Sequence, residues 1–253
     1  MSSWGNQRRT KIIFVFFLIV AIIIVVILFS LTRVDPTCFD GKDNNGEFGV
    51  DCGGPCLLLC ENQTITPIIN WVRYFEIIPG FYNTVAMIEN KNVDAEAKNV
   101  GYRFELYDQH NALIAKRTGT INIRPKEIIP IVEHNVNTGK LKATRVAFFL
   151  EDTIWTKSDI KERVLIIKNE QDYEVDGLPR ISAVLFNSSF YPVKDISVIV
   201  VAYDDENNAI TTSSTVVDII NPNSSKDLIF TWPNKLEKDI ASFEIIPLYE
   251  FNS

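Results

Sequence analysis

From about residue 64 onward, apolar and polar positions alternate in short runs separated by Asn, Asp, Gly and Pro. The clearest run is 100–107, with the sequence VGYRFELY. Its apolar face consists of Val100, Tyr102, Phe104 and Leu106. Arg103 and Glu105 lie on the opposite face, as in a half-buried β-strand. A turn DQHN and a second run ALIAK follow, so this segment predicts a β-hairpin.

The same arrangement recurs 96 residues later in the chain. The segment ISVIVVAYDDENNAIT (196–211) aligns with VGYRFELYDQHNALIA (100–115). The matched pairs are Tyr107 with Tyr203, Asp108 with Asp204, Asn111 with Asn207 and, further upstream, Val85 with Ile181. A repeat of this length is the size of a domain and too long for a solenoid unit.

Each copy contains about six or seven strand-like runs. In the first copy they lie near 68–72, 82–89, 100–107, 112–116, 120–123, 128–133 and 144–151. In the second they lie near 164–168, 181–186, 196–203, 209–212, 215–220, 227–231 and 240–246. The predicted fold class is therefore all-β, with two tandem immunoglobulin-like β-sandwiches at 64–158 and 159–253. Neither copy contains a cysteine, so apolar packing has to hold each one together.

The N-terminal pattern is of a different kind. Residues 12–31, IIFVFFLIVAIIIVVILFSL, contain no charge, Pro or Gly. As a helix they would span roughly 30 Å, the hydrocarbon thickness of a bilayer. The alternative is a cleaved signal peptide, but no A-x-A-like site follows the run. We expect a retained, single-pass signal anchor whose partner is the lipid bilayer.

Basic residues set the expected orientation of this anchor. Arg8, Arg9 and Lys11 precede the run without any acidic residue. The positive-inside rule then makes 1–11 a cytoplasmic tail and places the domains after the anchor outside the cytoplasm. The chain carries a net charge of −7, and all its acidic residues fall in that external part. This excess of acids argues against a nucleic-acid partner.

All four cysteines lie between residues 38 and 60. They are Cys38, Cys52, Cys56 and Cys60, within an expected module at 32–63. Outside the cytoplasm such thiols oxidise, which favours two disulfides, with three pairings left open. Zinc, or free thiols with a redox role, are the alternatives, but the segment has neither a CxxC knuckle nor a histidine. Disulfides also suit a segment too short to bury a core.

Two parts of the chain resemble known families. The segment 38–60 resembles an extracellular cysteine module with the pattern C-x-D-G-x2-N-x2-E-x3-D-C-G-G-x-C. FELYD resembles the signature of the FxLYD family of extracytoplasmic domains, with Phe104, Leu106, Tyr107 and Asp108 at the named positions. The second copy keeps only the Tyr-Asp pair. The FxLYD resemblance implies a β-sandwich that is often tethered to a membrane and has no known catalysis.

Oxygen-bearing side chains crowd the loop between the first two cysteines. They are Asp40, Asn44, Glu47 and Asp51. Calcium takes six to eight such oxygen ligands, and a cation would relieve repulsion between crowded carboxylates. The alternative is that these side chains cap turns by accepting bonds from backbone amides. The spacing does not fit an EF-hand. No cofactor is required by this sequence, and calcium is a hypothesis.

The sequence contains no recognisable catalytic motif. We therefore expect a non-enzymatic protein that acts in surface display, adhesion or assembly with an unknown envelope or surface protein. The alternative is an envelope sensor that binds a carbohydrate or another ligand. Phe190 and Tyr191 are the candidate contacts for such a ligand, and core packing is the competing interpretation of that pair.

Overall fold

The computed structural model describes residues 3–32, 37–158 and 163–249. It divides into two compact units, residues 1–56 and 57–253. The expected boundary between the sandwiches, at 158/159, adjoins residues 159–162, which lie outside the described residues. Residues 33–36 of the expected cysteine module also lie outside them.

The first unit contains the helix α1 (Ser3–Thr32). Its described side chains from Ile13 to Ile27 are apolar, and nearly all of them are exposed. No helix within the described part of the chain has both the length and the apolar character needed to cross a membrane. The transmembrane interpretation of residues 12–31 therefore stays a prediction.

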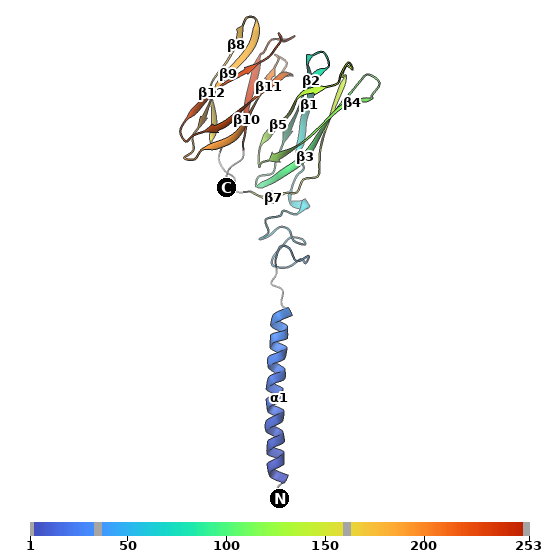
Figure 1. Cartoon of the computed structure of the whole chain (residues 1–253), viewed down its shortest axis with the longest axis vertical. Helices are drawn as coiled ribbons and strands as arrows, with labels where there is room; N and C mark the ends of the chain where they lie inside the picture. The colour runs from blue at the N-terminus through green and yellow to red at the C-terminus, as the bar shows by residue number, and fades with distance from the viewer. Residues whose placement is uncertain (1–2, 33–36, 159–162, 250–253) are drawn as a thin grey trace. The chain divides into compact units, whose positions relative to one another are not determined.

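The second unit begins with a short 3-10 helix, η1 (Glu61–Gln63), and a first pair of antiparallel sheets (Figure 1). One sheet has the order β1-β2-β5, with the strands β1 (Ile68–Ile78), β2 (Phe81–Glu89) and β5 (Ile128–Asn137). The other has the order β4-β3-β6, with the strands β4 (Leu113–Ile123), β3 (Ala95–Tyr107) and β6 (Arg145–Leu150). The two-residue strand β7 (Thr156–Lys157) pairs with the start of β3.

The next six strands repeat this topology. One sheet has the order β8-β9-β12, with the strands β8 (Leu165–Val175), β9 (Leu178–Asn187) and β12 (Ser225–Thr231). The other has the order β11-β10-β13, with the strands β11 (Ala209–Ile220), β10 (Val193–Tyr203) and β13 (Ser242–Leu248). Strands β8 to β13 thus correspond to β1 to β6. The all-β expectation is confirmed as two sandwich-like pairs of sheets.

Two details of the predicted strands are wrong. The runs 112–116 and 120–123 form one strand, β4, because its ladder with β3 continues through Gly119, opposite Tyr102. The runs 209–212 and 215–220 form β11 in the same way, through the serines opposite Val200 and Ile199. Small and hydroxyl side chains at these positions do not interrupt the backbone ladder.

The upstream alignment of the two copies also shifts by one residue. The backbone N–H of Asn90 bonds the carbonyl of Glu127, and that of Asn187 bonds the carbonyl of Ser224, both over 2.9 Å. Asn90 therefore corresponds to Asn187, and Val85 does not correspond to Ile181. The change of offset from 96 to 97 lies near a register shift between Ala97 and Val100 in the β3–β4 ladder, which the β10–β11 ladder lacks at the equivalent place.

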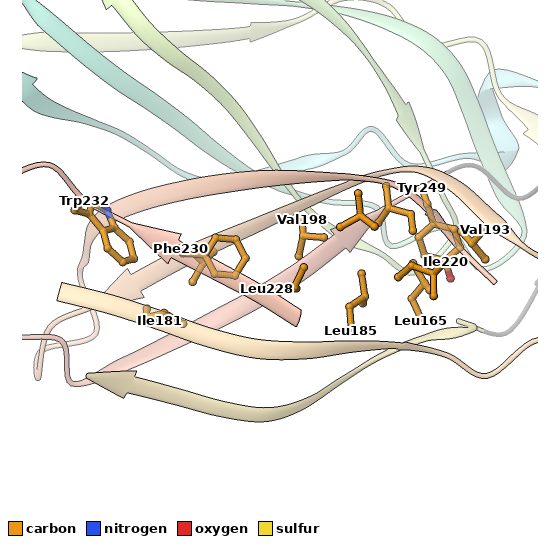
Figure 2. Packing of buried hydrophobic residues seen from close by; sticks show 13 residues of the cluster. Leu165, Ile181, Leu185, Val193, Val198, Ile220, Leu228, Phe230, Trp232 and Tyr249 are labelled. Atoms are coloured by element: carbon orange, nitrogen blue, oxygen red, sulfur yellow. The ribbon is translucent and has the colours of Figure 1, made fainter. Parts of the chain in front are cut away.

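Each sandwich has its own apolar core without a cysteine. Figure 2 shows the core of the second sandwich, which extends from Trp232 at one end to Leu165 and Tyr249 at the other. In the first sandwich, Phe104 and Phe148 pack with ring centroids 4.8 Å apart. Burial at roughly 25 cal/mol per Å² of apolar surface supplies the cohesion that a disulfide gives to antibody domains.

A further apolar cluster joins the two sandwiches within the second unit. Met87 of the first sandwich packs with Ile199, Val201 and Tyr203 of β10. The indole of Trp71 meets the ring of Tyr203 edge-on, with centroids 6.4 Å apart. Strand β2 is consequently buried at every position from 82 to 88, and β10 from 198 to 203. Strands buried on both faces are typically near-continuous apolar runs. Strand β10 follows this pattern from 198 to 203, whereas β2 also buries Asn83 and Thr84.

Candidate functional site

The cysteine module is cross-linked by disulfides. Cys38 bonds Cys56, with Cα atoms 5.6 Å apart. Cys52 and Cys60 are disulfide-bonded as well, and no cysteine of the described residues is free. The disulfide prediction is confirmed against zinc and against free thiols, because sulfur in a disulfide is not a thiolate ligand.

The crowded acids of this module bond backbone amides. The Asp51 carboxylate accepts the N–H of Asp40 over 3.0 Å and that of Gly41 over 3.0 and 3.1 Å. Glu47 is buried, and its Oε2 accepts the N–H of Asp51 over 3.1 Å. These bonds tie the two ends of the loop together. They are the contacts expected from turn-capping side chains.

Asp40 and Asn44 are the other two residues of the predicted calcium site. The Asn44 amide donates to Asp40 over 3.0 Å, and this bond lowers the pKa of the Asp40 carboxyl below its usual range. The structure thus brings all four predicted residues together in one loop, with amides as the partners of their carboxylates. Calcium binding there stays a prediction. Glu47 also lies within 3.2 Å of the Cys56 sulfur, which is in the disulfide.

The Tyr-Asp pairs occupy equivalent turns in the two sandwiches. Asp108 Oδ1 accepts the N–H groups of His110 and Ala112 over 2.8 and 2.9 Å. Asp204 Oδ1 accepts those of Glu206 and Asn208 over 3.2 and 2.8 Å. These bonds give both carboxylates the structural, turn-capping role predicted from the sequence.

The two turns differ in their surroundings. Asp204 is 3% exposed and is paired with the ammonium of Lys238, while no such cation pairs with Asp108 among the described ion pairs. The hydrogen bond from Lys238 lowers the pKa of Asp204, and the same bond raises the pKa of Lys238. Lys238 belongs to the segment 232–241 that links β12 to β13. This segment has no equivalent of the same length in the first sandwich, where 138–144 makes the corresponding connection.

A cleft lies beside the Asp204 turn, between the two sandwiches, with a volume of about 580 Å³. We call it the inter-sandwich cleft. Its walls are residues 73–77 of β1, residues 208–211 at the start of β11, and residues 232–238. The Asn234 side chain crosses from the second sandwich to the first and donates to the carbonyl of Ile77 over 2.7 Å. The cleft could not be predicted from the sequence, because its walls come from three distant segments.

Two buried polar atoms of the cleft lining lack hydrogen-bond partners. They are Nε1 of Trp232, a residue that is 3% exposed, and Oγ1 of Thr211. Among the described residues, neither atom has a donor or acceptor within bonding distance. A buried polar group without a partner costs about 1–3 kcal/mol. Both residues line the cleft, and both atoms are themselves enclosed by protein.

The predicted ligand contacts Phe190 and Tyr191 lie in the loop between β9 and β10, away from the cleft lining. Phe190 is 92% exposed and Tyr191 is 41% exposed, so neither is a core residue. Asn187, at the end of β9, holds the loop in place. Its buried amide donates to the carbonyls of Tyr191, Ile220 and Asn221 over 2.9–3.2 Å. The exposed aromatic pair thus sits on an ordered support.

Comparison with known proteins identifies no family. No family model matches the chain, and no curated protein matches it. Among solved structures, a transglutaminase from red sea bream is similar, with 11% sequence identity and a TM-score of 0.27. The match covers 75% of this chain and 32% of that one. A likeness this weak carries no argument about fold and gives no support for an enzymatic activity.

Proposed function

We propose that this protein is a membrane-anchored, extracytoplasmic, non-enzymatic protein that works in surface display, adhesion or assembly with another envelope protein. The anchor and the orientation rest on the sequence, namely the uncharged run 12–31 and the basic residues before it. The disulfides support an oxidising location. The FxLYD-like identity of the first sandwich is part of the proposal and rests on Phe104, Leu106, Tyr107 and Asp108.

The observation that carries this proposal is the packing between the sandwiches. Two sheets meet face to face through Met87, Trp71 and the outer residues of β10. Such an interface holds two domains as one body, whereas domains joined only by a linker move independently. A rigid pair presents its loops and its cleft in fixed positions, which suits recognition of a partner.

Protease accessibility tests the anchor and its orientation. Protease added to intact cells should remove an epitope tag placed after Ser253, which itself lies outside the described residues. Lysed cells provide the control for tag cleavage. Complete protection of the tag in intact cells would refute the extracytoplasmic placement. A pull-down from native membranes, with the chain as bait, then tests for a protein partner.

A second candidate function is ligand binding by an envelope sensor. The observation that favours it is the inter-sandwich cleft, whose lining includes the polar side chains of Trp232 and Thr211. An indole N–H and a hydroxyl together suit a ligand that both accepts and donates, such as a sugar hydroxyl. Soluble oligosaccharides should raise the melting temperature of the wild-type chain and should raise that of a Thr211→Val variant less. No shift with any sugar would remove a carbohydrate from consideration.

A further inference from the structure

The chain enters the second unit at the end of the first sandwich that contains the β2–β3 loop and residues 155–157. We call this end the entry end. Here the N–H of Leu59 bonds the carbonyl of Trp155 over 2.9 Å, and the N–H of Lys157 bonds the carbonyl of Leu57 over 2.8 Å. The N–H of Ile65 donates to the side chain of Asn92 in the β2–β3 loop over 2.8 Å. The segment that leads in from the cysteines is therefore fixed to this end of the first sandwich.

The corresponding end of the second sandwich is joined to it. Glu127, in the β4–β5 loop at the entry end, forms an ion pair with Arg163 over 3.3 Å. The guanidinium of Arg124 lies 4.6 Å from the ring centre of Tyr249. The Tyr249 hydroxyl accepts the N–H of Val164 over 3.1 Å, so the first residues of the second sandwich are held here too. The entry ends of both sandwiches thus form one surface.

The Phe190 loop belongs to this surface. Its Ser188 donates from both the backbone N–H and the hydroxyl to the carbonyl of Val164, over 2.8 and 2.9 Å. Ser189 and Asn187 bond each other within the loop over 2.7 Å. The loop is therefore ordered before any partner arrives. An ordered loop loses little conformational freedom on binding, which favours contact through its exposed aromatic tip.

Apolar tips gather at the entry end on separate loops. They are Leu57, Ile65, Val93, Ile154, Phe190 and Tyr191, all of them exposed. The most prominent are Phe190 at 92% and Ile154 at 73%. The opposite end also exposes apolar side chains, among them Ile78, Leu113 and Leu141, beside the charged β10–β11 turn DDENN. The entry end is distinguished by how far its most prominent tips, Phe190 and Ile154, are exposed.

We propose that the entry end contacts the interfacial region of a lipid bilayer through these tips. The inference rests on the proposed membrane anchor, since that anchor would keep the entry end close to the membrane and give it a high effective concentration there. The tips come from several loops, and none of them lines the inter-sandwich cleft. Isolated apolar tips match a deformable lipid phase better than a shaped protein surface. Apolar side chains at an interface enter the headgroup–acyl boundary to a depth of about 5–10 Å.

The test uses the full chain in phosphatidylcholine liposomes, with and without bromine on the upper acyl chain. Tryptophan replaces one exposed residue at each end, as Phe190→Trp at the entry end and Leu141→Trp at the opposite end. Leu141 is 52% exposed, so both substitutions leave the core unchanged. The signal is the fluorescence that each variant adds to that of the wild-type chain. Flotation of the liposomes reports separately whether the chain is anchored.

The expected result is flotation of both variants, strong bromine quenching of the Phe190→Trp signal and little quenching of the Leu141→Trp signal. Flotation with no quenching at position 190 would overturn the lipid contact while leaving the anchor intact. Equal quenching at both positions would overturn it too, because the ends would not differ. Failure to float would refute the anchor, and the lipid contact with it. If bromine quenching of the Phe190→Trp signal disappeared only after addition of a membrane extract, a protein would bind the apolar tips in place of lipid.

Discussion

Strands β3 and β10 hold equivalent positions in the two sandwiches, but their outer faces have different neighbours. The outer face of β3 carries Arg103 and Glu105, which form an ion pair over 2.7 Å and remain partly accessible to solvent. The equivalent residues of β10 are Ile199 and Val201, which are buried against the first sandwich. The inner faces of both strands are alike. The two copies therefore share apolar residues on their inner faces, which form the cores. Their outer-face residues differ because only β10 packs against a neighbouring domain there.

Strands β2 and β9 are also equivalent, and here it is the strand of the first sandwich, β2, whose outer face is covered. Met87 of β2 is buried under the second sandwich, whereas its equivalent Val184 faces outward beside Lys168, the counterpart of Trp71. The Lys168 ammonium lies 3.8 Å from the ring centre of Phe186, on that same outer face. A lysine in place of a tryptophan makes the last sheet more polar.

The largest expected effect comes from a charge on the buried outer face of β10. Val201→Glu should cost about 4 kcal/mol of unfolding free energy, because an unpaired carboxylate would be buried between the sandwiches. The matched change on β3, Glu105→Val, should cost about 1 kcal/mol or less, as for other solvent-accessible pairs. Urea unfolding of the two variants measures both values. Losses of equal size would mean that the two faces are not different environments.

A smaller effect is expected at a position where the sandwiches agree. Asn90→Ala and Asn187→Ala should each cost about 2–3 kcal/mol, because several buried carbonyls would lose their donor. Asn90 donates to the carbonyls of Ala95 and Arg124, and Asn187 to those of Tyr191, Ile220 and Asn221. The exposed Asn62→Ala is the control and should change nothing. A large loss in one sandwich alone would contradict the equivalence of the two loops.

The third effect concerns the two turn-capping aspartates. Asp204→Ala should lower the melting temperature more than Asp108→Ala, since only Asp204 is buried beside a lysine. Lys238→Met separates the two contributions, because it removes the ion pair and keeps the turn cap. We expect the Lys238→Met variant to fall between the wild-type protein and Asp204→Ala. An Asp108→Ala variant that is the less stable of the two would refute the role of the ion pair.

The smallest effect is a pH dependence at the contact between the sandwiches. Nε2 of His134, on β5, lies 2.7 Å from the Ser214 hydroxyl of β11, and burial lowers the pKa of His134. The folded protein then binds fewer protons than the unfolded chain, whose histidine titrates near 6.5. This contribution to stability is present above about pH 6.5 and is lost as the pH falls through the lowered value. A His134→Asn variant should show a flatter dependence between pH 7.5 and 5, and an identical slope would contradict the assignment.

Much of the fold could be predicted because it is encoded locally. Alternation on β3, the turn at Asp108 and the disulfide-forming cysteines each depend on a few neighbouring residues. The merging of two predicted runs into β4 was missed, because polar and small residues such as Gly119 do not break a strand that is paired along its length. The predicted capping role of Asp108 and Asp204 needed only the turn sequence.

The inter-sandwich contacts could not be predicted in the same way. The apolar outer face of β10 is visible in the sequence as the run VIVVAY, but the sequence does not say what covers it. The cleft depends on three segments that meet only when both sandwiches are in place. The sequence predicts Phe190 and Tyr191 as candidate ligand contacts, but nothing local indicates that a buried Asn187 holds their loop in an exposed position.

The buried position of Asn187 has a consequence for how this chain can be produced. Asn187-Ser188-Ser189 is an acceptor sequence for N-linked glycosylation. Its amide nitrogen is fully enclosed and occupied by three carbonyls. A glycan added there before folding would keep the β9–β10 loop from closing. Secretion from a eukaryotic cell should therefore give a chain that is retained as misfolded, and Asn187→Asp would not repair it, because a carboxylate cannot donate to those carbonyls. The exposed sequons at Asn62 and Asn223 would tolerate the same modification.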